Sequence, residues 1–213
     1  MKYTLTLIAA LVTLLAPGEI TNAEISDPLL AQRAQGIYLN ITNVKNADFT
    51  TTVLQRLRDR GLTTVVFDVK DKYVYFDSQD GELAKEAGLV LSLYDLHDLI
   101  AEAKKDGIYT IARFVAVKDK ALGDALPDTR IKHPLTKVGL DSEWVEPSHE
   151  TVLEYNRQLI TEVARSGVGE ISLDYIRYPT DNISSLSHMT TAEKVVHLEA
   201  FVRMARRAID TVG

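Results

Sequence analysis

The sequence predicts an α/β protein of the (β/α)8-barrel type that contains only the first four to five strand–helix units of such a barrel. Three observations support this class: short β-branched runs alternate with helical patterns, a glycine precedes each run, and polar residues gather where the runs end. Alternation of strands with helices is typical of parallel βαβ units.

Four β-branched runs are expected to form the parallel strands. They cover residues 37–41, 63–69, 109–115 and 170–176. A helix that ends in a left-handed turn places a glycine shortly before the next strand. The glycines that stand ahead of the runs are Gly36, Gly61, Gly107 and Gly167.

Four helices are expected to follow these strands, each with one apolar stripe. We expect Asp48 to cap the first helix, Ser92 to open the second and Ser148 to start the third. Thr190 and Glu193 form a capping-box pattern ahead of the fourth.

Parallel strand–helix units build either an open doubly wound sheet or a closed barrel. A dinucleotide-binding open sheet carries a glycine-rich turn after its first strand, whereas residues 42–45 contain no glycine and the chain has no P-loop pattern. Polar residues follow the second, third and fourth runs, and a barrel carries its functional residues at these strand ends. Residues 116–147 form a long connection without strong periodicity, as binding loops often do.

Residues 1–23 have the pattern of a cleaved signal peptide, which leaves residues 24–213 as the barrel domain. Lys2 precedes an uncharged run over residues 5–16, and Ala23 ends a segment of small residues. The run has about half of the roughly 20 residues that a bilayer-spanning helix needs. The sequence therefore predicts export to the periplasm or the medium, with a retained anchor as the alternative and no stable membrane span after cleavage.

The composition excludes several classes of function. The chain has 46% hydrophobic residues and a formal net charge of −6, which is typical of a soluble globular protein. The deficit of positive charge argues against nucleic-acid binding. Because the chain has no cysteine, thiolate metal sites and cysteine nucleophiles are excluded. Its five histidines lack metal-ligand spacing, so we expect neither a metal nor a cofactor.

Four stretches resemble a bacterial family of glycoside hydrolases that was first catalogued as a domain of unknown function and is related to the α-amylase-like barrels. They are FDVKD at residues 67–71, IARFV at 111–115, WVEP at 144–147 and EISLDYIRYP at 170–179. The block around Asp174 is the most specific. The resemblance implies a (β/α)8 barrel that hydrolyses glycosidic bonds.

Two carboxylates, Asp174 and Asp68, are the predicted catalytic residues, because glycoside hydrolysis uses a pair of carboxyl groups. The resemblance implies that Asp174 is the nucleophile, although Ser172 stands where those barrels usually carry an arginine. A structural role, paired with Arg177 or capping a turn, is the alternative for Asp174. Asp68 is expected either to hold a sugar hydroxyl or to form a buried ion pair.

The acid partner is less well defined. In the α-amylase-like arrangement it is a glutamate on a fifth strand, and the sequence reaches Gly213 just after the fourth helix. We therefore expect either a truncated chain or a half-barrel that self-associates through its open sheet edge. Glu143 and Glu146 are the alternatives within the chain.

Further residues are expected to bind the substrate. A buried arginine needs a charge partner, so Arg113 is expected to pair with Asp174. Aromatic side chains match the apolar faces of sugar rings, with packing as the alternative for each. The predicted binding residues are Lys70, Arg113, Trp144, Tyr175, Arg177 and Tyr178.

Two functions follow from these features. The first is an exported glycoside hydrolase that acts on a polysaccharide or oligosaccharide, with Asp174 as its principal catalytic carboxylate. The alternative is an exported carbohydrate-binding or envelope-scaffolding protein that keeps the barrel mouth without turnover.

Overall fold

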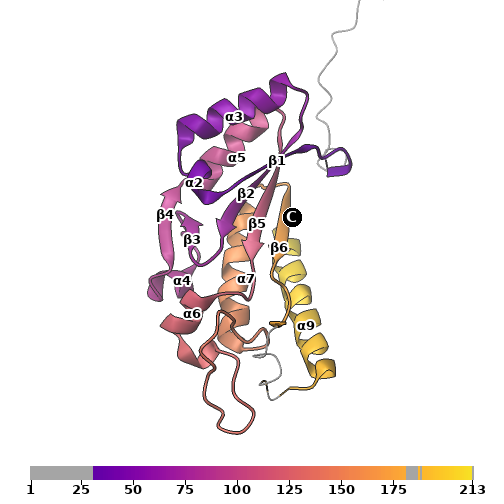
Figure 1. Ribbon diagram of the computed structural model, residues 1–213. Coiled ribbons are helices and arrows are strands. Elements are labelled where there is room, and N and C mark those ends of the chain that lie inside the picture. Colours follow the sequence, from indigo (N-terminus) through magenta and orange to yellow (C-terminus); the bar gives the residue numbers. More distant parts are fainter. Residues whose placement is uncertain (1–30, 181–186, 188, 213) are drawn as a thin grey trace, which may run out of the picture.

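The computed structural model describes residues 31–180, 187 and 189–212 (Figure 1). The predicted signal peptide lies outside the described residues. None of the helices in the described part of the chain is both long enough and apolar enough to cross a bilayer.

Four parallel strands form the centre of the sheet: β1 (Gly36–Leu39), β2 (Thr64–Lys70), β5 (Tyr109–Val115) and β6 (Glu170–Asp174). β1 pairs with β2, β2 with β5 and β5 with β6. These four strands are therefore neighbours in the order of the chain, as in a barrel, without the reversal of a doubly wound sheet. Among the described residues β1 and β6 do not pair with each other, so the sheet is not closed.

All four predicted strands are present, but the first and the last end two residues early. Asn40 ends the first because its side chain caps the short helix α2 (Ile41–Val44), where it accepts from the Asn43 amide at 3.2 Å. The last strand ends at Asp174 because Tyr175 adopts a left-handed backbone with φ of 53°.

An insertion that the sequence did not predict follows β2. It consists of β3 (Val74–Phe76), α4 (Glu82–Glu86) and β4 (Val90–Tyr94). The prediction that Ser92 opens a helix is wrong, because Ser92 lies within β4. Asp95 caps the next helix instead, by accepting from an amide in its first turn.

The predicted helices occur in the predicted order, but most of their N-cap residues differ from the predicted ones. α3 (Ala47–Asp59) is capped by Asn46, which leaves Asp48 inside the first turn, and α5 spans Leu96–Lys105. α7 (Glu150–Arg165) is capped by His149, the residue after Ser148. α9 (Thr191–Asp210) begins with the predicted capping box, in which Thr190 and Glu193 bond each other's backbone amides.

The long connection between β5 and α7 contains two short helices, α6 (Lys120–Ala125) and η1 (Pro127–Thr129). Isolated backbone bridges, such as that between Arg130 and Val145, fold the rest of the connection back on itself. The connection therefore has more structure than its lack of periodicity suggested.

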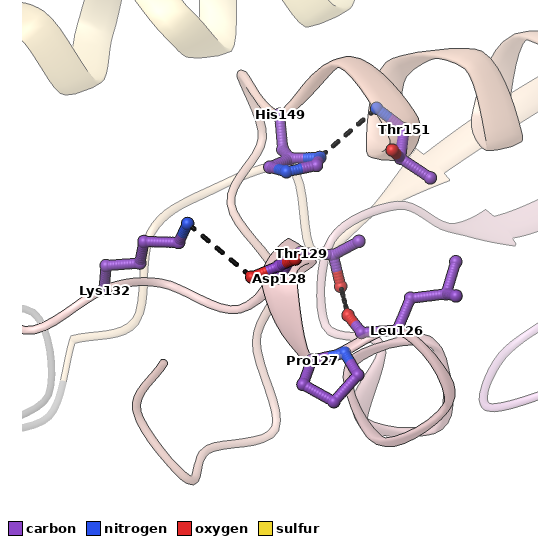
Figure 2. A pocket seen from close by; sticks show the side chains of 7 residues that line it. All are labelled: Leu126, Pro127, Asp128, Thr129, Lys132, His149 and Thr151. Atoms are coloured by element: carbon purple, nitrogen blue, oxygen red, sulfur yellow. Dashed lines mark hydrogen bonds and ion pairs between the residues drawn. The ribbon is translucent and has the colours of Figure 1, made fainter. Parts of the chain in front are cut away.

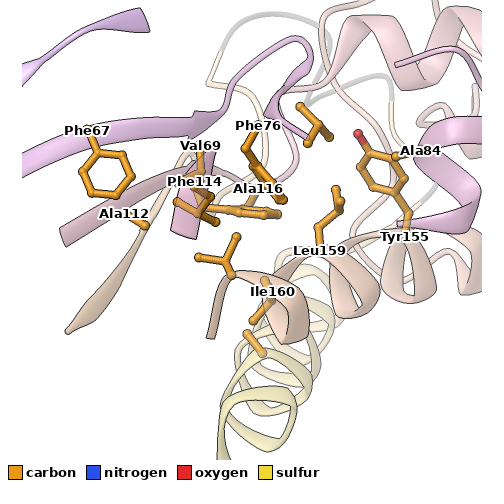
Figure 3. Close-up of a cluster of buried hydrophobic side chains, with 14 of the residues drawn as sticks. Phe67, Val69, Phe76, Ala84, Ala112, Phe114, Ala116, Tyr155, Leu159 and Ile160 are labelled. Carbon is orange, nitrogen blue, oxygen red and sulfur yellow. The ribbon is translucent and has the colours of Figure 1, made fainter. Parts of the chain in front are cut away.

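The two faces of the sheet differ in character. One face packs against α7, and Figure 3 shows Phe67, Val69 and Phe114 of the sheet in one cluster with Tyr155 and Leu159 of that helix. All five are fully buried. Burial of such side chains contributes about 1.5–3 kcal/mol each, so this face is the main core. The opposite face carries the polar residues described next.

Candidate functional site

Three neighbouring strands bring two aspartates to one arginine. The strand register places Asp68 of β2 directly beside Arg113 of β5. The Nη1 atom of Arg113 donates to Asp68 Oδ1 at 2.8 Å, and its Nε and Nη2 atoms donate to Asp174 Oδ2 at 2.9 and 2.7 Å. The ion pair predicted between Arg113 and Asp174 is thus present, and the same guanidinium brings both predicted catalytic carboxylates together.

Asp68 is held from several sides, and its side chain is 5% exposed. The Tyr38 hydroxyl donates to Asp68 Oδ2 at 2.7 Å, and the Tyr94 hydroxyl donates to the Asp68 carbonyl at 2.8 Å. Burial and the hydrogen bond to Asp68 raise the pKa of Tyr38 to about 12. Asp68 is therefore a fixed acceptor with little surface for a ligand.

Asp174 is the accessible member of the pair, with its side chain 40% exposed. Its Oδ1 atom accepts from the Tyr175 amide at 2.7 Å, and its Oδ2 atom accepts from Arg113. Left-handed backbone at a residue other than glycine is strained by about 1–3 kcal/mol, and Tyr175 carries that strain next to this carboxylate. The carboxylate is held in place and still reaches solvent.

Arg113 stays charged within this group. Burial by itself would lower its pKa, but the hydrogen bonds to Asp68 and Asp174 raise that pKa above its usual value. A permanent cation between two carboxylates compensates the repulsion that they would otherwise exert on each other.

Aromatic and cationic side chains lie beside Asp174. The rings of Trp144 and Tyr175 are 5.9 Å apart between centroids. The guanidinium carbon of Arg177 lies 4.6 Å from the Trp144 centroid, and Lys118 Nζ lies 4.9 Å from the Tyr175 centroid. Trp144 is buried, whereas Tyr175 is half-buried and Arg177 is exposed. Tyr175 and Arg177 therefore offer surface to a ligand.

Tyr178 lies in a different, buried network. Its hydroxyl donates to Glu146, and His197 Nδ1 of α9 lies 3.4 Å from the same hydroxyl. Burial and the bond to Glu146 raise the pKa of Tyr178 above its usual value. Glu146 Oε2 is buried with no hydrogen-bond partner among the described residues. This network joins the long connection to α9 and gives Tyr178 little surface for stacking on a sugar.

Lys70 lies away from the other predicted binding residues. Its side chain is 0% exposed and ion-pairs with the equally buried Asp119 at 2.8 Å. It also donates to the Val115 carbonyl at 2.8 Å. Such burial does not agree with the predicted contact to a sugar, because no surface of Lys70 is left for one.

Sequence reasoning missed two residues of this region, Tyr38 and Asp119. Nothing local marks Tyr38, because its partner Asp68 stands 30 positions later in the chain. Asp119 is one of the polar residues that follow the third run, and its pairing with Lys70 depends on the fold. Among the described residues no three histidine, aspartate or glutamate side chains converge as a metal site.

Two hollows of the surface lie away from the carboxylate pair. Figure 2 shows one of about 440 Å³, lined by η1 and by Leu126, Lys132, His149 and Thr151. A second, of about 420 Å³, lies between α3 and α5. Neither is lined by Asp68, Arg113 or Asp174.

Comparisons with known proteins give one family and a consistent fold. The family model described as "Putative glycosyl hydrolase domain" matches residues 36–213. A solved hypothetical protein from Ruminiclostridium thermocellum is similar at 23% identity and a TM-score of 0.71, over 81% of this chain and 92% of that one. No curated protein matches the chain.

Larger solved enzymes share the fold over part of their length. A family 20 exo-β-N-acetylglucosaminidase from Vibrio harveyi is similar at 15% identity and a TM-score of 0.60, over 85% of this chain. An α-galactosidase from Lactobacillus brevis is similar at 14% identity and a TM-score of 0.51. This chain spans 34% of the first enzyme and 26% of the second.

Proposed function

The chain belongs to the family of putative glycosyl hydrolase domains, and we propose that it hydrolyses glycosidic bonds of a polysaccharide or oligosaccharide without a cofactor. The observation that carries the proposal is the Asp68–Arg113–Asp174 group on three adjacent parallel strands. Strand ends of this kind hold the active sites of barrel enzymes.

Asp174 is the proposed catalytic carboxylate. Glycoside hydrolysis develops positive charge at the anomeric carbon, which a carboxylate stabilises or attacks. Asp174 is the more exposed of the two, and Arg113 with the Tyr175 amide fixes its orientation. Asp68 holds the other side of Arg113 and so fixes the guanidinium. Tyr175 and Arg177 are the proposed contacts to the sugar.

Accessibility favours Glu143 over Glu146 as the acid that protonates the leaving oxygen. The side chain of Glu143 is 55% exposed and ion-pairs at 3.1 Å with Lys118, which lies against Tyr175. Glu146 is 10% exposed and accepts from Tyr178. Only the first can meet a substrate without rearrangement of the connection.

We also propose that the sheet is an incomplete (β/α)8 barrel, in which the open edges of β1 and β6 are covered by a second copy of the chain. Ile37 of β1 is exposed, and Tyr38 is about half exposed although its hydroxyl reaches the buried Asp68. An open edge strand is a template for pairing with another chain. Analytical ultracentrifugation tests this pairing, and a monomer at all concentrations would contradict it. Export, from the signal pattern of residues 1–23, is likewise proposed.

Non-catalytic carbohydrate binding is the second candidate function. It is favoured by the hydrogen bonds that both carboxylates already make within the chain: Asp68 accepts from Arg113 and Tyr38, and Asp174 accepts from Arg113 and the Tyr175 amide. A site whose acids are occupied within the chain suits binding more readily than proton transfer.

The test is a panel of polysaccharides with the parent and the Asp174→Asn variant. Loss of a group that stabilises the transition state lowers kcat by at least about 100-fold, and we expect that loss here. Asp128→Asn, at an exposed position of η1, is the matched control and should be as active as the parent. Unchanged hydrolysis in Asp174→Asn would reject the assignment, and sugar binding without hydrolysis in the parent would support the second function.

A further inference from the structure

Strand β2 is irregular next to the carboxylate pair. Asp68 lies opposite Arg113 of β5, and Lys70 lies opposite Phe114, so one extra residue, Val69, is accommodated in β2. In a regular strand, residues two apart face the same side of the sheet. Here the bulge turns Asp68 toward the open face and Lys70 toward the core. Bulges of this kind re-aim side chains beside functional sites.

Lys70 is bound entirely on the core side of the sheet. Its Nζ atom lies 2.8 Å from Asp119 Oδ2 and 2.8 Å from the Val115 carbonyl oxygen. The same atom lies 5.3 Å from the ring centroid of Phe114 and 5.4 Å from that of Tyr155, two residues of the cluster in Figure 3. If the bulge were lost, the ammonium would leave these contacts.

Asp119 connects this charge to the segment that follows β5. Its Oδ1 atom accepts from the Leu122 amide at 2.9 Å and so caps α6, while its Oδ2 atom faces Lys70. The pair therefore ties the end of β2 to the end of β5 and to the start of the long connection. These are the elements that surround Asp68 and Arg113.

A contribution to stability does not by itself explain why Lys70 and Asp119 are both charged in the core. A buried ion pair is often no better than packed apolar residues of similar size, and its clearest documented role is to specify a register. Either methionine or leucine would fill the space beside Phe114 and Tyr155. A charge that must meet Asp119 and the Val115 carbonyl, by contrast, accepts only one register of β2.

We propose that Lys70 and Asp119 are positioning residues that hold the bulge of β2 and thereby aim Asp68 at Arg113. The proposal rests on the proposed function only for its effect on hydrolysis. Its geometric content, the orientation of Asp68, can be measured without a substrate.

The experiment uses the double variant Lys70→Met/Asp119→Asn, which removes both charges and keeps an N-cap residue for α6. The Tyr38 hydroxyl reports on Asp68, because burial and the bond to Asp68 raise the pKa of Tyr38 to about 12. Tyrosine titration is followed by ¹³C NMR, and Tyr38→Phe identifies the signal. We expect the Tyr38 pKa to fall toward its ordinary value of 10.0, and kcat to fall while the fold persists.

Two controls distinguish a change in the orientation of Asp68 from a general loss of structure. Leu54→Ala, at a fully buried position of α3, should lower the unfolding temperature and leave the Tyr38 pKa unchanged. Tyr75 is an internal comparison, because burial and Asp71 are the first two causes that raise its pKa to about 12, and Asp68 acts only third, through its charge. General unfolding would lower both tyrosine pKa values, whereas a misaimed Asp68 lowers that of Tyr38 more.

A folded double variant with an unchanged Tyr38 pKa would overturn the proposal. If the double variant does not fold, Asp119→Glu keeps both charges, moves the carboxylate by one methylene and should still lower the Tyr38 pKa; no shift there would also overturn the proposal. A shift in Tyr38 with no hydrolysis by the parent would leave the positioning intact and reject the proposed function. Hydrolysis by the parent together with an unchanged Tyr38 pKa in the variant would support the proposed function and overturn the positioning.

Discussion

Two ion pairs join the same two regions of the chain and lie on opposite faces of the sheet. Asp68 meets Arg113 on the open face, where the arginine side chain is 21% exposed, and Lys70 meets Asp119 in the core, where both side chains are 0% exposed. A ligand can reach Arg113 of the first pair, whereas neither side chain of the second pair is exposed. One extra residue in β2 places the Asp68–Arg113 pair on the face of the proposed site and the Lys70–Asp119 pair in the core.

The largest effect is expected for Lys70→Met. This change leaves Asp119 buried without its cation, and removal of one partner of a buried pair destabilises by about 3–5 kcal/mol. Urea unfolding measures the loss. The double variant Lys70→Met/Asp119→Asn should recover most of it, and a loss below about 1 kcal/mol in the single variant would show that the core pair is not isolated from water.

A smaller loss is expected for Arg113→Gln on the open face. Asp68 loses a charged donor, and a hydrogen bond to a charged group is worth about 1.5–3 kcal/mol. Asp174 is exposed enough for water to replace its lost bonds. The free energy of unfolding should therefore fall by less than in Lys70→Met. If the order of these two variants were reversed, the contrast between the two faces would be wrong.

Tyr38→Phe should change stability mainly at high pH. The pKa of Tyr38 is raised from 10.0 to about 12 by burial and by Asp68. The folded protein therefore favours the protonated hydroxyl, so this stabilisation is complete below pH 10 and is lost as the pH rises through about 12. Unfolding midpoints across this range should fall less steeply in Tyr38→Phe than in the parent. Equal slopes would show that Tyr38 does not report on Asp68.

The smallest effect is expected for Arg157→Gln, an exposed ion pair on α7. The side chains of Arg157 and Glu154 are 48% and 40% exposed, and Arg157 Nη2 lies 2.6 Å from Glu154 Oε1. Exposed pairs of this spacing contribute about 0.3–0.5 kcal/mol. Urea unfolding should thus place this variant close to the parent. If the free energy of unfolding fell as much as in Arg113→Gln, the contribution of an ion pair in this protein would depend on its distance and not on its exposure.

Much of the frame could be predicted because it depends on local patterns. The four parallel strands follow from β-branched runs after glycines, and the capping box at Thr190 follows from side chains three residues apart. The pairing of Arg113 with Asp174 was also predicted, because a charge at that depth needs a partner. The insertion after β2 was missed, since Ser92 and Asp95 both have the chemistry of a cap and only β3, which pairs with β4, decides between them.

The sequence by itself determined the alternation of strands and helices, the acidic strand ends and the family, because periodicity and short motifs are properties of neighbouring residues. Tertiary structure alone decided that Lys70 is buried while Asp68 faces the open side. Alternation along a strand predicts one face for both residues. The bulge that separates them exists because Phe114, Val115 and Asp119, some 45 to 50 positions later in the chain, lie beside β2 in the folded protein.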